Sequence, residues 1–251
     1  MNRGLWVRGL RVAIVLAGGL AALMLAGCGK HEAQATAVPV PAMKPAPPTP
    51  IDTKKAEVGG TTWDPEWDKI VELALPPAML SGLVPHDVRR FCPAFYGMAE
   101  DDKRAFWAYF FQALAGAEAG LEPTVQVKHS QPEMLVKDEV TGRPGRTSGL
   151  LQLTYEDQKR YGCDFDWERD KKLKVGDPGR SILQPKNNLE CGVKILDKQI
   201  IEKHKALLSA SGYWSTLRPG TVSYQVFAKQ MTNVPAACRV KVENGSGRKG
   251  R

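Results

Sequence analysis

The segment from Glu100 to Ala119 constrains the fold of this chain more than any other part of the sequence. Its apolar residues form two neighbouring stripes at helical spacing: Phe106, Phe110, Ala113 and Ala117 in one, and Trp107, Phe111 and Leu114 in the other. The acidic residues 100–102 favour a helix start, and Gly120 and Pro123 end the pattern. We therefore predict a long helix that is buried over a wide arc.

Weaker patterns on both sides of this helix complete a mainly α fold. Asp64-Pro65-Glu66 opens a short helical pattern that Pro76-Pro77 stops, and Thr154 to Asp157 resembles a capping box for a helix that closes at Gly162. A further helix follows Pro185 and is expected to run to about residue 208. Strand signals are few, so we expect one domain with at most a small hairpin between residues 125 and 153.

The first residues have the layout of a secretory signal. Arg3, Arg8 and Arg11 precede an uncharged apolar run that ends in Leu25-Ala26-Gly27-Cys28, which resembles the bacterial lipobox. In that motif the cysteine becomes the N-terminus and is acylated, so we expect Cys28 to carry a membrane anchor. The alternative is an ordinary signal that is cleaved near Gly27 and leaves a free thiol. The residue after Cys28 is not Asp, which fits sorting to the periplasmic face of the outer membrane.

Composition divides the rest of the chain. Residues 1–27 are the signal peptide, and residues 28–62 are rich in Pro and Ala and too poor in large apolar groups to fold, so we expect a tether. Residues 63–238 carry enough apolar groups for one domain with a core, and residues 239–251 form a basic disordered tail. The formal charge of +8 favours anionic partners; export argues against nucleic acid and leaves the cell wall and anionic lipids.

Four cysteines remain in the domain when Cys28 is set aside. An even number in an oxidising compartment predicts two disulfides, for which three pairings exist. We predict Cys163 with Cys191, which flank a Lys- and Asp-rich loop, and Cys92 with Cys238, which ties the two ends of the domain together. The four histidines lie far apart without metal-ligand spacing, so we expect no metal site and no cofactor.

Glu118 is the strongest catalytic candidate. It continues the stripe of Trp107, Phe111 and Leu114 at the next helical position, so its carboxylate projects from an apolar face in the last turn of the helix. Burial and the negative end of the helix both disfavour the ionised form, as a general acid for glycosidic cleavage requires. The competing interpretation is a solvated surface glutamate near a helix end.

Three motifs in order around Glu118 carry a resemblance. They are Ala117 to Pro123, the tetrapeptide Gly149-Leu150-Leu151-Gln152, and the set Pro185, Asn188, Gly192 and Ile195-Leu196. Together they resemble the soluble lytic transglycosylase family of lysozyme-like enzymes. Two departures stand out: Ala119 replaces the usual Ser, and Gly212-Tyr213-Trp214-Ser215 stands near the place of the family's Ala-Tyr-Asn motif.

The resemblance implies a lysozyme-like α+β fold and a role for each site residue. Glu118 would protonate the oxygen between N-acetylmuramic acid and N-acetylglucosamine of a peptidoglycan strand and then deprotonate the muramic 6-hydroxyl, which closes a 1,6-anhydro ring. Gln152 and the backbone of Gly149, Leu150 and Leu151 would line the cleft and bond sugar amides, although Gln152 could equally tie down its loop. Tyr213 would hold Glu118 or the sugar, or else close the core.

Two other functions remain open from the sequence. A hydrolytic lysozyme needs a second acid, for which Asp138 and Glu139 are the candidates in the segment after Glu118. A non-catalytic peptidoglycan-binding or scaffold lipoprotein would keep the cleft without the chemistry, and Ala119 is the best support for it.

Overall fold

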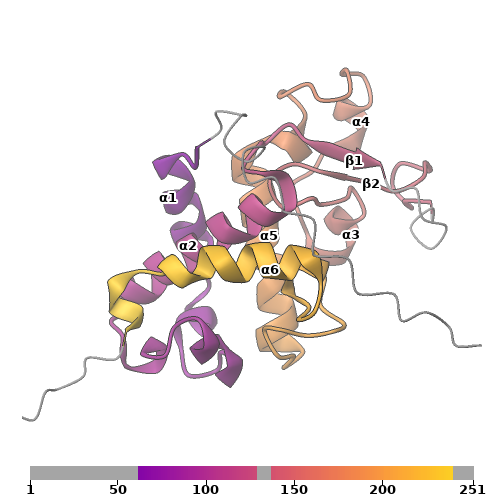
Figure 1. Ribbon diagram of the computed structural model, residues 1–251. Coiled ribbons are helices and arrows are strands. Elements are labelled where there is room, and N and C mark those ends of the chain that lie inside the picture. The colour runs from indigo at the N-terminus through magenta and orange to yellow at the C-terminus, as the bar shows by residue number, and fades with distance from the viewer. Residues whose placement is uncertain (1–61, 129–136, 240–251) are drawn as a thin grey trace, which may run out of the picture. The chain divides into compact units, whose positions relative to one another are not determined.

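The computed structural model describes residues 62–128 and 137–239 and shows a mainly α domain with a small antiparallel hairpin (Figure 1). Its helices and strands are α1 (Pro65–Ala74), α2 (Glu100–Ala119), β1 (Gln126–Lys128), β2 (Arg146–Ser148), α3 (Asp157–Tyr161), α4 (Trp167–Asp170), α5 (Pro185–Asp197) and α6 (Val222–Gln230). Short 3₁₀ turns connect several of them. The predicted fold class is confirmed. Across the described ranges, no helix has both the length and the apolar character that a membrane span requires.

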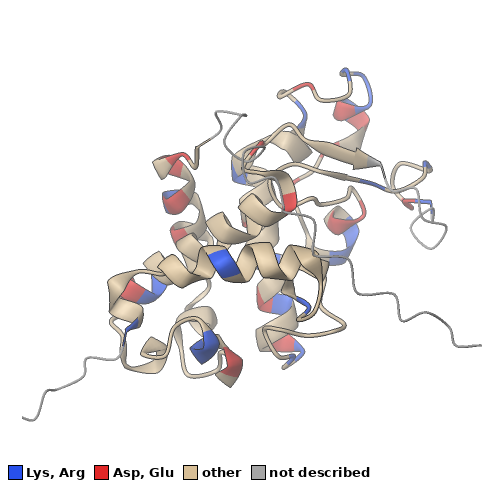
Figure 2. Cartoon of the chain, viewed as in Figure 1, with Lys and Arg blue, Asp and Glu red and all other residues tan. Residues whose placement is uncertain are grey.

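Helix α2 is the buried helix that the sequence predicts, and its bounds match. Phe106, Trp107, Phe110 and Phe111 are all fully buried and meet one another at edge-to-face or tilted angles, which favour aromatic pairs. The indole of Trp107 donates to the carbonyl of Met79 at 2.8 Å, so its polar atom is satisfied inside the core. Figure 2 shows charged residues over the outer helices and loops, whereas the middle of α2 carries none.

Helices α1 and α6 pack against α2. The predicted start of α1 is confirmed, because the carboxylate of Asp64 caps the helix by accepting from the N–H of Glu66 at 2.9 Å. The contact with α6 is close at Gly116, where a Cβ atom would lie 2.6 Å from Oε1 of Gln230. The sequence analysis did not identify α6, in which only Phe227 is buried.

The hairpin places alternate residues on opposite faces. Gln126 pairs with Ser148 and Val127 pairs with Thr147, so one pair faces each side of the two-stranded sheet. In Figure 1 the hairpin lies at one end of the domain beside α3 and α4. The predicted hairpin between residues 125 and 153 is therefore confirmed.

Helix α5 ends earlier than its apolar pattern suggests. After Asp197 the chain makes a π-helical turn, Lys198–Glu202, and leaves the helix instead of continuing to about residue 208. The carboxylate of Asp87 accepts from the N–H groups of Leu207 and Leu208 at 3.0 and 2.8 Å, which holds that segment in a loop. A tertiary contact has overridden the local pattern.

Both predicted disulfides are present, Cys92 with Cys238 and Cys163 with Cys191. The first joins residues 146 positions apart, and the N–H of Ala94 adds a hydrogen bond of 3.1 Å to the carbonyl of Cys238. The signal peptide, Cys28, nearly all of the tether and the tail after Arg239 lie outside the described residues, so their interpretation stays as the sequence predicts it.

Candidate active site

Glu118 lies in the last turn of α2 and faces a cleft of about 490 Å³. The face of the hairpin that carries Val127 and Thr147 forms one wall, and the segment around Tyr213 forms another. Further lining residues are Gln152, Thr154, Glu156, Arg160, Trp214, Ser215 and Arg218. The structure thus brings Glu118, Gln152 and Tyr213 together, although they come from three separate parts of the chain.

Glu118 has the surroundings that its position on the apolar stripe predicts. Burial raises the pKa of its carboxyl, and a hydrogen bond from the hydroxyl of Thr216 partly offsets this by lowering the pKa. Its Oε1 atom is buried without a hydrogen-bond partner among the described residues. The balance favours the protonated form at a higher pH than for an exposed glutamate.

Thr216 is a site residue that the sequence analysis missed. It belongs to the 3₁₀ turn Ser215–Leu217, which packs against both α2 and α6, and its own side chain is buried. Glu118 therefore has a hydroxyl partner from a segment distant in sequence, although its neighbour Ala119 carries none. No motif around Thr216 indicates this contact, because it depends on how the turn docks onto α2.

The side chain of Gln152 ties down its own loop. Its Nε2 donates to the carbonyl of Gly149 at 2.8 Å, and its Oε1 accepts from the hydroxyl of Thr147 at 2.8 Å. Gln152 also has a φ of +50°, which few residues other than glycine adopt. Of the two roles open to Gln152 from the sequence, the structure shows the loop-holding one, at the edge of the cleft.

The assignment of Leu150 and Leu151 to sugar contacts is wrong. Both residues, backbone included, are fully buried, and neither lines the cleft. The N–H of Leu151 donates to Oδ1 of Asn188, and its carbonyl accepts from the indole of Trp214, each at 2.8 Å. The backbone N–H and carbonyl of Leu151 are thus already occupied by protein partners.

Gly149 likewise has a structural role rather than the predicted role in binding sugar. It is buried with a φ of +78°, and a Cβ atom there would lie 2.4 Å from Nδ2 of Asn188. That amide donates to the carbonyls of Ser148 and Ile182 at 3.2 and 2.9 Å. Gly149 and Asn188 belong to two of the motifs that carry the family resemblance. Their close contact, with the hydrogen bond from Asn188 to Ser148, attaches the hairpin to α5.

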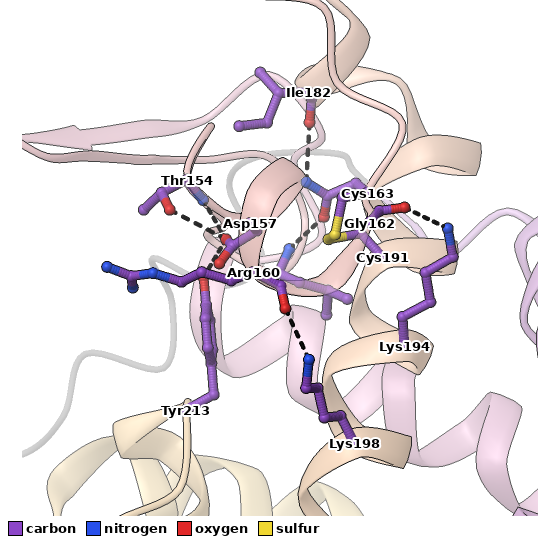
Figure 3. The surroundings of a disulfide bond; sticks show 12 residues. Thr154, Asp157, Arg160, Gly162, Cys163, Ile182, Cys191, Lys194, Lys198 and Tyr213 are labelled. Carbon is purple, nitrogen blue, oxygen red and sulfur yellow. Dashed lines mark hydrogen bonds between the residues drawn. A yellow bond between two sulfur atoms is a disulfide. The ribbon is translucent and has the colours of Figure 1, made fainter. Parts of the chain in front are cut away.

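Tyr213 lines the cleft, but its hydroxyl does not hold Glu118 as expected. It donates instead to Oδ2 of Asp157 at 2.6 Å, and the same oxygen accepts from the N–H of Thr154 at 2.8 Å (Figure 3). Burial raises the pKa of Asp157, and these hydrogen bonds partly offset the effect. Tyr213 therefore fixes the start of α3 at the edge of the cleft.

The disulfide between Cys163 and Cys191 holds the other end of α3 beside α5 (Figure 3). Lys194 and Lys198 of this region donate to the carbonyls of Gly162 and Arg160 at 2.7 and 3.0 Å. These carbonyls lie at the C-terminal end of α3, where cations are favoured. Helix α3, which contributes Arg160 to the cleft lining, is thus held at both of its ends.

Comparison with known proteins supports the fold. No family model and no curated protein matches the chain. The chain is similar to three solved structures of Bd0314 DslA, a Bdellovibrio protein. They are the wild type in form 2 and two variants that each replace one glutamate by glutamine. Each is 23% identical over 69% of this chain and 91% of the other, with TM-scores of 0.55, 0.55 and 0.54. The fold is similar to that of DslA.

The second acid that the sequence suggested is not in the cleft. Asp138 is buried elsewhere, where Oδ1 accepts from the N–H groups of Val140 and Thr141 at 2.9 and 2.8 Å, and Glu139 is exposed. Neither residue lines the cleft of Glu118. The prediction that Asp138 or Glu139 serves as a second catalytic carboxylate is therefore wrong, because neither lies beside Glu118.

Glu156 is the carboxylate that does share the cleft with Glu118. It forms an ion pair with Arg160, and its Oε1 accepts from the N–H of Glu139 at 2.7 Å. These two contacts occupy both of the oxygens that a catalytic base or nucleophile would use. Within the described ranges, no group of three His, Cys, Asp or Glu residues is arranged to hold a metal ion.

Proposed function

We propose that this protein is a peptidoglycan lytic transglycosylase, anchored to a membrane through Cys28, that cleaves the bond between N-acetylmuramic acid and N-acetylglucosamine. The observation that carries the proposal is Glu118, a partly buried carboxyl with a raised pKa that faces a cleft of about 490 Å³. A carboxyl that keeps its proton at higher pH is suited to protonating a leaving oxygen.

One carboxyl is enough for the whole reaction. Protonated Glu118 gives its proton to the glycosidic oxygen as the bond from that oxygen to C1 of the muramic residue breaks. The resulting carboxylate then takes the proton of the muramic 6-hydroxyl, whose oxygen bonds to C1 and closes the 1,6-anhydro ring. Glu118 ends the cycle protonated, and no water is consumed.

The hydrogen bond and the ion pair of Glu156 support this route over hydrolysis. An inverting hydrolase needs a second carboxylate that is free to activate water, and a retaining one needs it as a nucleophile. Glu156 lines the cleft, but Arg160 and the N–H of Glu139 occupy its oxygens. Because Glu156 lines the same cleft as Glu118, hydrolysis with Glu156 as the second acid is the alternative mechanism to be tested.

The test of the proposal is digestion of purified peptidoglycan by three glutamine variants. Glu118→Gln keeps the size of the side chain but cannot transfer the proton, so we expect the rate to fall by about 100-fold or more. Glu139→Gln is the matched control, because Glu139 is exposed and outside the cleft, and its rate should stay at that of the wild type.

Glu156→Gln separates the two enzymatic mechanisms. The transglycosylase route predicts a change of a few-fold at most, whereas hydrolysis with Glu156 as the second acid predicts a loss comparable to that of Glu118→Gln. Wild-type activity in Glu118→Gln would overturn the site assignment. A folded wild-type protein that binds glycan strands without cleaving them would instead support the binding-protein alternative.

A further inference from the structure

A second cavity, of about 260 Å³, lies on the opposite face of the hairpin from Glu118. The alternation of the strands separates the two sites: Val127 and Thr147 line the cleft of Glu118, whereas Gln126, Arg146 and Ser148 line the second cavity. Trp167 of α4 also lines this cavity, and Figure 1 shows α4 beside the hairpin.

Gln126 is an unsatisfied polar group in this cavity. Both Oε1 and Nε2 of its side chain are buried, and neither has a hydrogen-bond partner among the described residues. A buried amide without partners costs free energy, because it gives up its hydrogen bonds to water and gains none in return. It calls for a ligand that supplies both an acceptor for Nε2 and a donor for Oε1.

Arg180 is a second unsatisfied group in the same lining. Its residue is only 5% exposed, and its Nε atom is buried without a hydrogen-bond partner. Its guanidinium donates to the carbonyl of Leu173 at 3.0 Å and forms a hydrogen bond with Tyr155, yet no ion pair of Arg180 occurs within the described ranges. A buried cation that forms no ion pair is costly, so an anionic ligand would be favoured beside Arg180.

The other charged residues of the lining also favour an anionic ligand. Arg143 and Arg146 are exposed at the rim, and Arg143 lies 5.4 Å from the ring centre of Trp167. Asp138 is the carboxylate in the lining, but its two oxygens already accept from three backbone N–H groups, those of Val140, Thr141 and Glu156. The positive charges therefore exceed the negative one and remain available to a ligand.

We propose that this cavity binds the C-terminal carboxylate of a short peptide. The carboxylate would meet Arg180 and Arg146, while the last peptide unit offers an N–H to Oε1 of Gln126 and an oxygen to its Nε2. Trp167 and Val175 provide apolar surface for a small side chain. A phosphate or sulfate lacks the N–H donor, so it satisfies only half of Gln126.

The source of such peptides follows only if the proposed function is correct. Peptidoglycan strands carry short peptides with free carboxylates, so one face of the hairpin would hold the sugar chain and the other its peptide. The binding measurement below uses no glycan, and its outcome is therefore independent of whether the protein cleaves.

The test is calorimetric titration of the full-length protein with three probes: N-acetyl-alanyl-alanine, its C-terminal amide and acetate. We expect the free acid to bind at least about 10-fold more tightly than the amide, because the amide has no negative charge to pair with Arg180. It should also bind at least about 10-fold more tightly than acetate, which has no peptide N–H. Equal binding of acid and amide, or no binding of any probe, overturns the site; acetate binding as tightly as the peptide overturns the peptide assignment.

Variants locate the binding. Gln126→Leu and Arg146→Ala should each weaken binding of the free acid by about 10-fold. Both residues are on a short hairpin rather than in the helical core, so folding is checked by an unchanged melting temperature. Arg90→Ala is the matched charge control, because it removes an exposed arginine that does not line the cavity. This variant should bind as the wild type does. Wild-type affinity in both hairpin variants would contradict the proposal.

Discussion

The hydroxyl of Thr216 donates a hydrogen bond to the carboxylate of Glu118. The bond stabilises the ionised form and lowers the pKa of Glu118, while burial raises it by more. Ala119, next to Glu118 in sequence, cannot supply such a hydroxyl. The acid of this site is thus tuned by a turn that docks onto α2 rather than by its immediate neighbour.

Thr216→Val should raise the pKa of Glu118 further, because it removes the interaction that favours the carboxylate while keeping the shape of the side chain. A reaction that needs protonated Glu118 then stays active to higher pH, so the alkaline limb of the pH profile should move upward. The measurement is the initial rate of peptidoglycan digestion against pH. Thr232→Val, at an exposed threonine outside the cleft, is the control and should leave the profile in place. An alkaline limb that stays put or moves down would show that Thr216 does not act on Glu118.

Glu118→Gln should stabilise the domain at neutral pH relative to the wild type. A carboxyl whose pKa is raised by folding binds more protons in the folded state, so its contribution to stability is present below the unfolded pKa and is lost as the pH rises through the folded pKa. The difference in free energy of unfolding between variant and wild type should therefore grow from about pH 4.5 upward and then level off. Denaturant titrations at several pH values measure it. A difference that is independent of pH would contradict the raised pKa.

Much of the fold follows from local patterns. The stripes of α2 and the acid before α1 both act within a few residues, and both helices were predicted correctly. Helix α6 was missed because only Phe227 of its residues is buried, which leaves no apolar stripe to detect. The end of α5 was placed too late because Asp87, far away in sequence, holds Leu207 and Leu208 in a loop.

The site was less predictable than the fold. The sequence located Glu118 through its apolar stripe, and the motifs brought Gln152 and Tyr213 to the same cleft. It did not indicate Thr216 or Glu156, whose proximity to Glu118 exists only after turns and hairpin have packed. The motif of Leu150 and Leu151 was misread for a related reason, since a motif marks a conserved arrangement of residues in a family and does not say whether each contacts substrate or core.

Gly192 tests the structural role of these motifs. A Cβ atom at this position would lie 2.1 Å from Cδ1 of Leu151 and 3.2 Å from Cε1 of Phe111, and both neighbours are fully buried. Gly192→Ala should therefore destabilise the domain by about 1 to 3 kcal/mol. Gly97→Ala, where no atom lies within 4 Å of the added Cβ, should change stability by less than about 0.5 kcal/mol. Equal melting temperatures for the two variants would contradict the close packing of α5 on α2.

Cys28→Ser tests the proposed anchor, which lies outside the described residues. The thiol is the only group of the lipobox-like motif that can be acylated, so the variant should move from the membrane fraction to the soluble fraction. Intact mass measurement of the wild type should show added lipid. A variant that still fractionates with membranes, together with a wild type of unmodified mass, would exclude lipidation at Cys28.

The mass of the products of peptidoglycan digestion tests the central claim most directly, namely that Glu118 alone performs both proton transfers. Purified peptidoglycan is digested with wild-type protein, and the muropeptides are weighed without reduction. Cleavage by Glu118 with ring closure gives 1,6-anhydromuramic ends, and each such product is one water lighter than the product of hydrolysis. Reducing muramic ends in place of anhydro ends would contradict the account and assign the protein to the hydrolases.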